Sequence, residues 1–408
     1  MDKRVYWVWL QTVVGCGWAH TARLLRRFGD AEGVWQADEA ALREAGLTGT
    51  VLKRAMHKTL DKAEKQLHLA LAQAWEVWTP DMPEFPSTWK VLSDLPLVIY
   101  ATDTMPFPHR TRPMVTVIAT RKISEKGRRV TGKLAAGLAA AGVTIVGDTI
   151  EGGDATAMMA VAAVGGAGVI VQPCALDVTY PRKTAHIRQA VLDAGGVVLS
   201  EFPAGTAVRK EHFRIRNRLL ATLGDALIVT EASEGSGTVT VAEMASAAGH
   251  EVYAVPGDPA TNAGCHRLIR DGAVLVQNGK QAAMELTDRY PALDVQLVEE
   301  AESAYVSKQP APPEKSKKQA PVPRYARQPV TPIVRPEPQP MPVVADLPPE
   351  LSENAKCVAT HLTASPQGLE ELTEKTSLSL PQVMMALTEL EMHGVAEKRA
   401  GSLYGRKG

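Results

Sequence analysis

Between residues 85 and 290 the sequence alternates short apolar runs with alanine-rich helical stretches, and this alternation constrains the fold most strongly. The runs with strand character cover residues 115–119, 143–146, 168–172, 196–199, 226–230 and 251–255. Helical stretches such as 132–141 and 155–164 separate them. Short buried strands alternating with helices predict an α/β fold, a Rossmann-like parallel sheet covered on both faces. Ligands of such sheets bind beyond the carboxyl ends of the strands.

A glycine turn follows one of these predicted strands. The run 226–230 leads into Gly235-Ser236-Gly237-Thr238, and a helix is predicted from Val239 to Ala248. A turn of this kind presents free backbone N–H groups and the positive end of a helix dipole. The segment is therefore a candidate phosphate-binding site.

A basic cluster precedes the same strand. It reads Phe213-Arg214-Ile215-Arg216-Asn217-Arg218. Its three arginines favour a nucleic-acid phosphate over a lone small molecule. Phe213 could stack on a base or be a core residue, and Arg216 and Arg218 could contact phosphate or pair with Glu201 or Glu231.

Thr120-Arg121 and Gly152-Gly153-Asp154 also follow predicted strands. Because the carboxyl ends of parallel strands share one edge, these segments should converge on a single site. The residues predicted to contact DNA phosphates or bases are Arg121, Ser124, Gly153, Phe213, Arg216, Asn217, Arg218, Gly235, Ser236, Gly237 and Thr238.

The remaining sequence divides into three further segments. Residues 1–80 have a helical pattern, and the turn Val13-Val14-Gly15-Cys16-Gly17 precedes a basic helix at 21–28. This arrangement is typical of helix-hairpin-helix or SAM-like domains that contact a DNA backbone, or of a bundle without a ligand. Residues 300–349 are rich in proline and basic residues and predict an extended linker.

Residues 350–408 predict a small winged helix. Helical patterns cover 353–362 and 368–375, and a third helix begins after Ser379 and runs to His393, before a hairpin at 395–404. The third helix carries Glu389 and Glu391 and no Lys or Arg, so it is not expected to read a DNA groove. Protein contacts, or weak DNA contacts through Lys398, Arg399 and Arg406, fit this segment better.

Composition limits the possible functions. The chain has 408 residues with 45 basic and 45 acidic ones, so any nucleic-acid surface must be a local patch. Its four cysteines lie far apart, which favours a reducing compartment and argues against a disulfide framework or a zinc site. No apolar run is long enough to span a bilayer, and the chain start reads as a helix of a folded domain. A cytoplasmic protein without a cofactor is expected.

From about Phe85 to Val276 the sequence resembles the DNA-processing protein A family (DprA, also called Smf). The resemblance rests on Phe85-Pro86, Leu95-Pro96, Tyr100, Thr120-Arg121, Gly153-Asp154, Leu176-Asp177, Tyr180-Pro181, Ser200-Glu201-Phe202-Pro203, Phe213, Arg216-Asn217-Arg218, Glu231-Ala232, Gly235-Ser236-Gly237-Thr238, Val255-Pro256-Gly257, Leu268-Ile269 and Gly272-Ala273. It covers about half the chain, and the helical front and winged-helix back match accessory domains of the family.

The resemblance implies an extended Rossmann-like domain that binds single-stranded DNA and forms a homodimer. It further implies protection of incoming single strands in natural transformation, loading of the RecA recombinase, and no chemistry on the DNA. The sequence departs from the family pattern around the predicted site, where Ala119 precedes Thr120-Arg121 and Asp148 and Glu151 add acidic groups. Met158 and His266 stand where the family has histidine and asparagine.

Three other functions compete with this one. The glycine turn is similar to that of Rossmann-like phosphoribohydrolases, but Val241 occupies the position of their catalytic glutamate. Residues 127–134 nearly spell a Walker A loop, yet Leu134 replaces the Mg²⁺-binding Ser or Thr, and the stretch is predicted to be helical. An interaction protein that has lost DNA binding would have Asp148 and Glu151 lining the site in place of Arg121 and Arg216.

Overall fold

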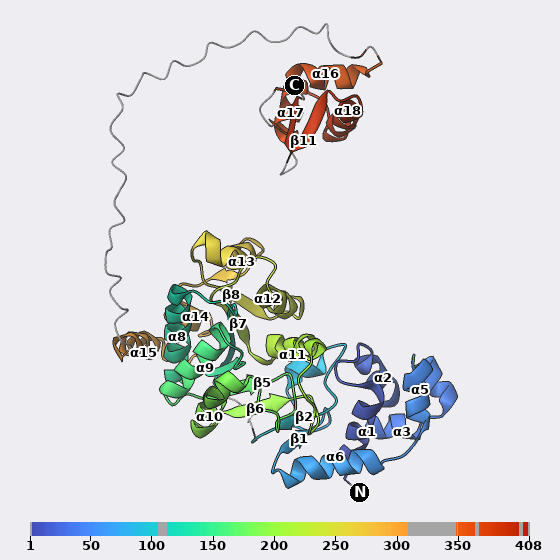
Figure 1. Cartoon of the computed structure of the whole chain (residues 1–408), viewed down its shortest axis with the longest axis vertical. Helices are drawn as coiled ribbons and strands as arrows, with labels where there is room; N and C mark the ends of the chain where they lie inside the picture. Colours follow the sequence, from blue (N-terminus) through green and yellow to red (C-terminus); the bar gives the residue numbers. More distant parts are fainter. Residues whose placement is uncertain are drawn as a thin grey trace. The chain divides into compact units, whose positions relative to one another are not determined.

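The structure is a computed structural model that describes residues 2–104, 112–308, 348, 350–363, 367–399 and 403–406. It divides the chain into two compact units, Met1–Lys315 and Ser316–Gly408 (Figure 1). The first unit combines a helical front with a Rossmann-like sheet, and the second is a winged helix. Within the described ranges, no helix is long and apolar enough to cross a membrane.

The first unit is built on a nine-stranded sheet in the order β1-β2-β6-β5-β4-β3-β7-β8-β9. The strands are β1 (Glu76–Trp78), β2 (Ile99–Ala101), β3 (Met114–Ile118), β4 (Thr144–Gly147), β5 (Gly168–Val171), β6 (Val197–Ser200), β7 (Ala226–Val229), β8 (Glu251–Ala254) and β9 (Val274–Leu275). Strands β3 to β9 pair in parallel, and β1 and β2 extend the sheet antiparallel beside β6.

The strand order reverses between β3 and β7. From β3 the chain moves outward through β4, β5 and β6, then returns to place β7 on the opposite side of β3. Val115 pairs with Ala226 and Ile118 with Val229, so both strands end at the same level. A reversal of this kind opens a crevice at the carboxyl ends, where open α/β sheets bind ligands.

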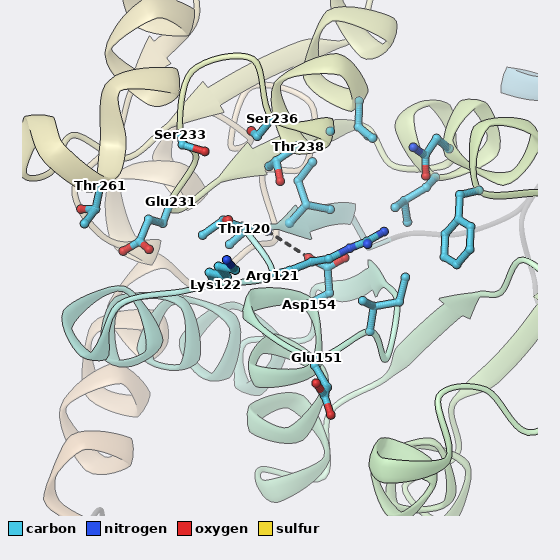
Figure 2. A pocket seen from close by; sticks show the side chains of 18 of the residues that line it. Thr120, Arg121, Lys122, Glu151, Asp154, Glu231, Ser233, Ser236, Thr238 and Thr261 are labelled. Atoms are coloured by element: carbon cyan, nitrogen blue, oxygen red, sulfur yellow. Dashed lines mark hydrogen bonds between the residues drawn. The ribbon is translucent and has the colours of Figure 1, made fainter. Parts of the chain in front are cut away.

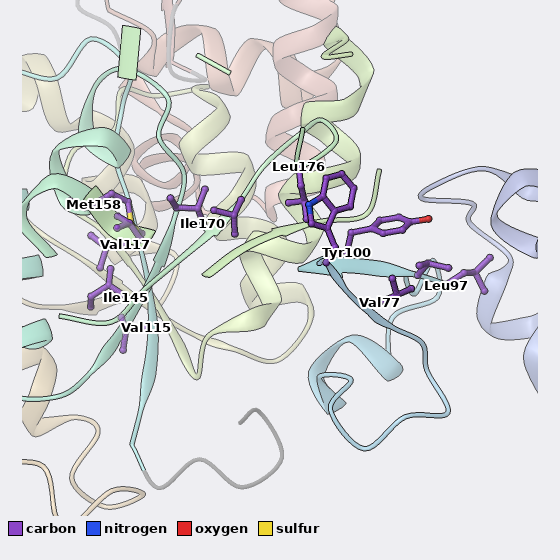
Figure 3. Close-up of a cluster of buried hydrophobic side chains, with 14 of the residues drawn as sticks. Val77, Leu97, Tyr100, Val115, Val117, Ile145, Met158, Ile170 and Leu176 are labelled. Carbon is purple, nitrogen blue, oxygen red and sulfur yellow. The ribbon is translucent and has the colours of Figure 1, made fainter. Parts of the chain in front are cut away.

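Helices cover both faces of the sheet. One face carries α8 (Glu125–Ala140), α9 (Gly153–Ala163) and α10 (Ala185–Asp193), and the other carries α11 (Lys210–Leu223), α12 (Gly237–Ala247) and α13 (Pro259–Arg270). Each face of the sheet packs against its helices in an apolar core of its own. Successive strand residues point alternately into the two cores, as Ile145 and Val146 do. Figure 3 shows the first core, where Val115, Val117 and Ile145 pack near Met158.

All six predicted strands are present and shifted by at most a residue or so at either end. The near-Walker segment 127–134 lies inside α8, as predicted, so it forms no phosphate loop. The sequence did not predict β1, β2 or β9, since strands of two or three residues carry no usable periodicity.

The helical front comprises α1 (Arg4–Val14), α2 (Thr21–Phe28), α3 (Ala31–Gln36), α4 (Glu39–Glu44), α5 (Gly49–Met56) and α6 (Asp61–Ala72). It shares its apolar core with the sheet domain. The buried side-chain amide of Gln11 in α1 donates to the Glu201 backbone carbonyl at 3.0 Å. The Tyr100 hydroxyl donates to Oε1 of the same Gln11 side chain at 3.3 Å. The front is therefore fixed to the sheet by buried polar contacts as well as by apolar packing.

The predicted linker starts too early. Helix α15 (Val295–Lys308) follows α14 (Gly279–Met284) and packs along α8. Val298 and Glu302 lie against Gly137, where a Cβ would collide with both, and the Tyr305 ring lies against Gly132. The wrong boundary arose because this helix depends on a tertiary neighbour that linker-like composition does not reveal. The rest of the predicted linker, 309–347 and 349, lies outside the described residues.

The second unit has the predicted winged-helix elements. They are α16 (Glu353–His361), α17 (Leu369–Thr376) and α18 (Leu380–Met392), followed by β11 (Ala396–Arg399) and β12 (Leu403–Arg406), with β10 (Gln367–Gly368) completing a small sheet. Ser379 and Gln382 form a capping box at the start of α18. Glu389 of α18 accepts a hydrogen bond from the Ser352 amide at 2.7 Å. The side chains of Lys398, Arg399 and Arg406 lie outside the described residues.

Candidate nucleic-acid interface

A cavity of about 580 Å³ occupies the crevice beyond β3 and β7. Figure 2 shows its lining from the β3–α8 loop, the start of α9, and the loop between β7 and α12. The described lining residues are Ile118, Ala119, Thr120, Arg121, Lys122, Ile150, Glu151, Asp154, Phe213, Arg216, Asn217, Leu220, Glu231, Ser233, Ser236, Gly237, Thr238, Val241, Ala260 and Thr261. We call it the central cavity. The predicted convergence of the strand ends is found here.

The start of α12 is open toward the central cavity. Gly235, in the left-handed region at φ 68°, turns the chain, and Ser236 takes the N-cap position. The Ser236 side chain makes no capping hydrogen bond, and its buried Oγ has no partner among the described residues. Since the first N–H groups of a helix lack intrahelical partners, Gly237 and Thr238 present donors to the cavity. The start of α12 therefore has the geometry of an anion-binding site.

The start of α8, by contrast, is already occupied by a carboxylate. Ser124 caps α8 by accepting from the Gly127 amide at 2.9 Å, and its own amide donates to the Glu231 carboxylate at 2.8 Å. The Ser124 hydroxyl also donates to Glu231. Gly127 is required here because a Cβ would overlap the Glu231 carboxylate. Ser124, predicted to contact phosphate, is therefore engaged by Glu231 and does not line the cavity.

Arg121 and Lys122 supply the exposed positive charge. Both are exposed, both line the central cavity, and neither has a carboxylate within 4.0 Å in the described part of the chain. The Arg121 guanidinium lies 5.5 Å from the centroid of the Phe213 ring, in a cation–π contact. Lys122 was not among the residues predicted from the sequence. Its position directly after Thr120-Arg121, at the end of a predicted strand, would have indicated it.

Arg216 reaches the cavity as half of a buried ion pair. Its Nη2 lies 2.6 Å from the Asp148 carboxylate, and the two side chains are 4% and 0% exposed. Arg216 Nε and Nη1 have no hydrogen-bond partner among the described residues. The side chain therefore keeps unused donors in the wall of the cavity, while Asp148 offsets its charge. Burial raises the pKa of Asp148, and the Arg216 charge opposes that rise.

Arg218 does not reach the central cavity. Its Nη2 bonds both carboxylate oxygens of Glu201 at 2.7 and 2.8 Å, and its Nε lies 3.2 Å from Asp94. Glu201 also accepts from the Gly17 amide at 3.1 Å. The predicted phosphate contact by Arg218 is thus replaced by the ion pair with Glu201 that was its alternative. Residues two apart on α11 point to different sides of the helix, which is why Arg216 and Arg218 separate.

The Gly152-Gly153-Asp154 turn is a packing element. The Gly153 amide donates to the Thr120 carbonyl at 3.1 Å, and a Cβ on Gly153 would overlap Ala119. The predicted phosphate contact by Gly153 is therefore replaced by tight packing of α9 against the end of β3. The Asp154 carboxylate accepts from the Ala119 amide at 3.0 Å (Figure 2). Protein atoms crowd that carboxyl, and burial raises its pKa to about 7.

Phe213 and Asn217 lie one helical turn apart on α11 and both line the cavity. Phe213 is half-buried, and its ring meets the Tyr180 ring at a tilt of 70° with centroids 6.0 Å apart. A partly exposed aromatic beside a guanidinium can accept a stacked base.

The acidic residues near the cavity have partners of their own. Glu231 is held by Ser124, Asp154 by Ala119, and exposed Glu151 lies 3.3 Å from Lys183. Asp148 does not line the cavity, whereas Arg121 and Arg216 do. Of the two acids expected to line the site in a protein that has lost DNA binding, Asp148 and Glu151, only Glu151 does.

The turn at residues 13–17, which the sequence left open as a DNA contact or as part of a bundle without a ligand, faces the protein. The Gly17 amide binds Glu201, and a Cβ on Gly17 would press within 3.1 Å of Ile215. In the basic helix α2, Arg27 pairs with Glu44 at 3.0 Å. The turn therefore joins the helical front to the sheet domain. Within the described ranges, no group of three or more His, Cys, Asp or Glu residues could hold a metal ion.

Comparisons with known proteins agree with this architecture. The family model DNA recombination-mediator protein A matches residues 76–287, and the DprA winged helix domain matches residues 342–402. Protein Smf of Synechocystis is 26% identical over all of this chain and 99% of its own length. The putative DNA processing protein DprA of Mycobacterium tuberculosis is 31% identical, covering 66% of this chain and 72% of that protein.

Among solved structures, DNA processing protein A of Streptococcus pneumoniae is similar with a TM-score of 0.58 and 25% identity. The match covers 70% of this chain and 99% of that one. The family model alone spans more than half of the sequence and contains all nine strands of the sheet. The chain therefore belongs to the DNA recombination-mediator protein A family.

Proposed function

We propose that this protein binds single-stranded DNA in the central cavity, holding the sugar–phosphate backbone without reading its sequence. The observation that carries the proposal is the start of α12, which has no side-chain cap and faces the same cavity as Arg121 and Lys122, two cations without a carboxylate within 4.0 Å among the described residues. Backbone amides and long basic side chains together are how proteins hold phosphates without sequence preference.

A single strand fits this cavity better than a duplex. The phosphate donors lie in a recess at the edge of the sheet, and Phe213 lies in its wall. An aromatic ring in that position can stack only on a base that has left its neighbours, as bases of single strands do. The Arg121 guanidinium lies 5.5 Å from the centroid of the Phe213 ring, so a phosphate donor and a stacking ring lie side by side.

The proposed role involves binding and no chemistry on the DNA. Glu231 and Asp154, two acids in the lining, hold backbone amides of Ser124 and Ala119. Each therefore has a structural task that positions a strand end. Val241, at the position where Rossmann-like phosphoribohydrolases carry a glutamate, lines the same cavity with an apolar side chain.

The family supports a wider role in DNA recombination. The Streptococcus pneumoniae relative is named a DNA processing protein, and we extend that activity to this chain. In this role the protein, as a homodimer, protects incoming single strands and helps the RecA recombinase onto them. Nuclease digestion of a labelled single strand should slow when the protein is added. RecA ATP hydrolysis on strands coated with a single-strand binding protein should start sooner.

Fluorescence anisotropy tests the binding itself. Labelled oligo-dT and a duplex of equal length are titrated with the full chain over a series of salt concentrations. We expect preference for the single strand and a steep loss of affinity with salt. Equal affinity for both DNAs, or no binding at low salt, would overturn the proposal. No binding would favour a protein that acts only through protein partners, an alternative to which the exposed Glu151 lends some support.

A further inference from the structure

The helical front contains a second cavity, of about 630 Å³, that lies outside the residues matched by the family model. Helices α1, α5 and α6 and the segment between α5 and α6 form it. Its described lining residues are Trp9, Thr12, Val13, Thr50, Lys53, Arg54, His57, Thr59 and Lys62. We call it the front groove. Its described lining contains two lysines, an arginine and a histidine, and no carboxylate.

The cations of the front groove are unused. Lys53, Arg54 and Lys62 are exposed, and none has a carboxylate within 4.0 Å in the described part of the chain. Other basic residues of the same domain do have partners. Arg27 pairs with Glu44, and the Lys58 amine donates to the Ala37 carbonyl at 2.7 Å. The front groove therefore gathers positive charge that the domain's own fold does not need.

The lining identifies the ligand's chemistry. Three threonines offer hydroxyl groups beside the cations, whereas the Trp9 ring is only 2% exposed and cannot stack on a base. Hydroxyls and cations without an aromatic face suit phosphates and sugars, not bases. We infer that the front groove binds the sugar–phosphate backbone of a single DNA strand.

A third cavity extends from the front groove to α11. Thr12 and Lys62 also line this neighbouring cavity of about 300 Å³, which reaches His212 and Ile215 of α11. Two other residues of α11, Phe213 and Arg216, line the central cavity. Helix α11 thus lies between the two sites, and a strand that occupies both would cross it. The inference rests on the proposed function, because it takes the occupant to be a strand that continues from the central cavity.

The test compares two charge-matched double variants of the full chain. Lys53→Glu/Arg54→Glu reverses two cations of the front groove. Arg26→Glu/Lys65→Glu reverses two exposed cations of the same domain that do not line it. Anisotropy is measured with a long oligo-dT and with one of about 6 nucleotides, a length that a single binding site can fill. The milder Lys62→Ala variant covers the case in which a double variant melts below the assay temperature.

The front-groove variant should bind the long strand at least ~10-fold more weakly, with a salt slope reduced by about two, one for each lost phosphate contact. Its affinity for the short strand, and the control's affinity for both, should match the unmodified protein. Equal loss, or no loss, in both double variants would overturn the inference.

Arg121→Ala/Lys122→Ala distinguishes this failure from failure of the proposed function. If that variant binds both strands normally while the front-groove variant does not, the central cavity is wrong and the front groove stands. The reverse pattern retains the central cavity and rejects the front groove.

Discussion

Arg216 meets the central cavity with its charge already offset by Asp148, whose carboxylate lies 2.6 Å from the Arg216 Nη2. Asp148 is one of the residues by which the sequence departs from the family pattern. The pair is buried, so removing either partner leaves an uncompensated charge. Arg216→Glu would place two carboxylates together in the interior, and a loss of DNA binding in that variant would report unfolding.

Asp148→Asn is the informative change at this pair. Asparagine keeps the acceptor for the Thr149 amide but no longer offsets the Arg216 charge, so the cavity becomes more positive. We expect single-strand affinity to rise about 3- to 10-fold and the salt slope to steepen by about one. Titrations of folded Asp148→Asn protein check this. An unchanged slope would mean that Arg216 makes no phosphate contact.

Arg218→Ala should destabilise the protein without weakening DNA binding. The substitution leaves Glu201 buried without its partner and weakens the junction with the Gly17 amide. We expect a loss of about 3–5 kcal/mol in the free energy of unfolding. Denaturant unfolding measures that loss, and anisotropy below the transition measures affinity. A stable variant with weakened binding would return Arg218 to the DNA-binding site.

Phe213→Ala should weaken binding without changing its salt dependence. Stacking contributes about 1–3 kcal/mol per base, so affinity should fall roughly 5- to 150-fold. Phosphate contacts are unaffected, and the salt slope should stay constant. Phe213→Tyr, which keeps the ring, is the matched control and should bind nearly as well as the unmodified protein. If alanine and tyrosine bind equally, Phe213 is a packing residue.

Asp154 predicts a pH dependence of stability. Its pKa is about 7 in the folded protein and 3.8 without the fold, so the folded state holds the extra proton between these values. Stability is therefore highest below about pH 4 for this group and declines as pH rises to about 7. Asp154 is partly exposed, and solvent weakens the effect of burial. We therefore expect the free energy of unfolding to decline by about 1–3 kcal/mol over this range.

Asp154→Asn should remove that decline, since asparagine still accepts from the Ala119 amide and does not titrate. Unfolding curves of both proteins from pH 4 to pH 8 measure the difference. Parallel pH profiles would show that Asp154 ionises normally.

The sequence predicted the parallel sheet well because its strands are apolar runs closed by glycine or polar residues. Those boundaries also predicted which segments come together, since Thr120-Arg121 and the Gly235–Thr238 turn follow strands that prove to be neighbours. The antiparallel additions β1 and β2 were not predictable in this way. Each has only three residues, too few to show a period. β2 also pairs with β6, which lies about a hundred residues further along the chain, and no local pattern records that pairing.

Individual site residues were harder to predict, because their roles depend on partners distant in sequence. Glu231 engages Ser124, and Ala119 lies against Gly153. Neither contact can be read from the spacing of these residues in the sequence. Helical periodicity of α11 would have separated Arg216 from Arg218, had the basic cluster been placed on a helix. The front groove was missed because its cations lie on two different helices.

Phosphate binding in the central cavity is measured by the salt dependence of single-strand binding in Arg121→Ala/Lys122→Ala. Arg270→Ala, at an exposed arginine outside the cavity, is the control. We expect the double variant to lose affinity by about tenfold or more, and its slope of log affinity against log salt to fall by about two. The control should retain both values. An unchanged slope in the double variant would contradict phosphate binding at the crevice between β3 and β7.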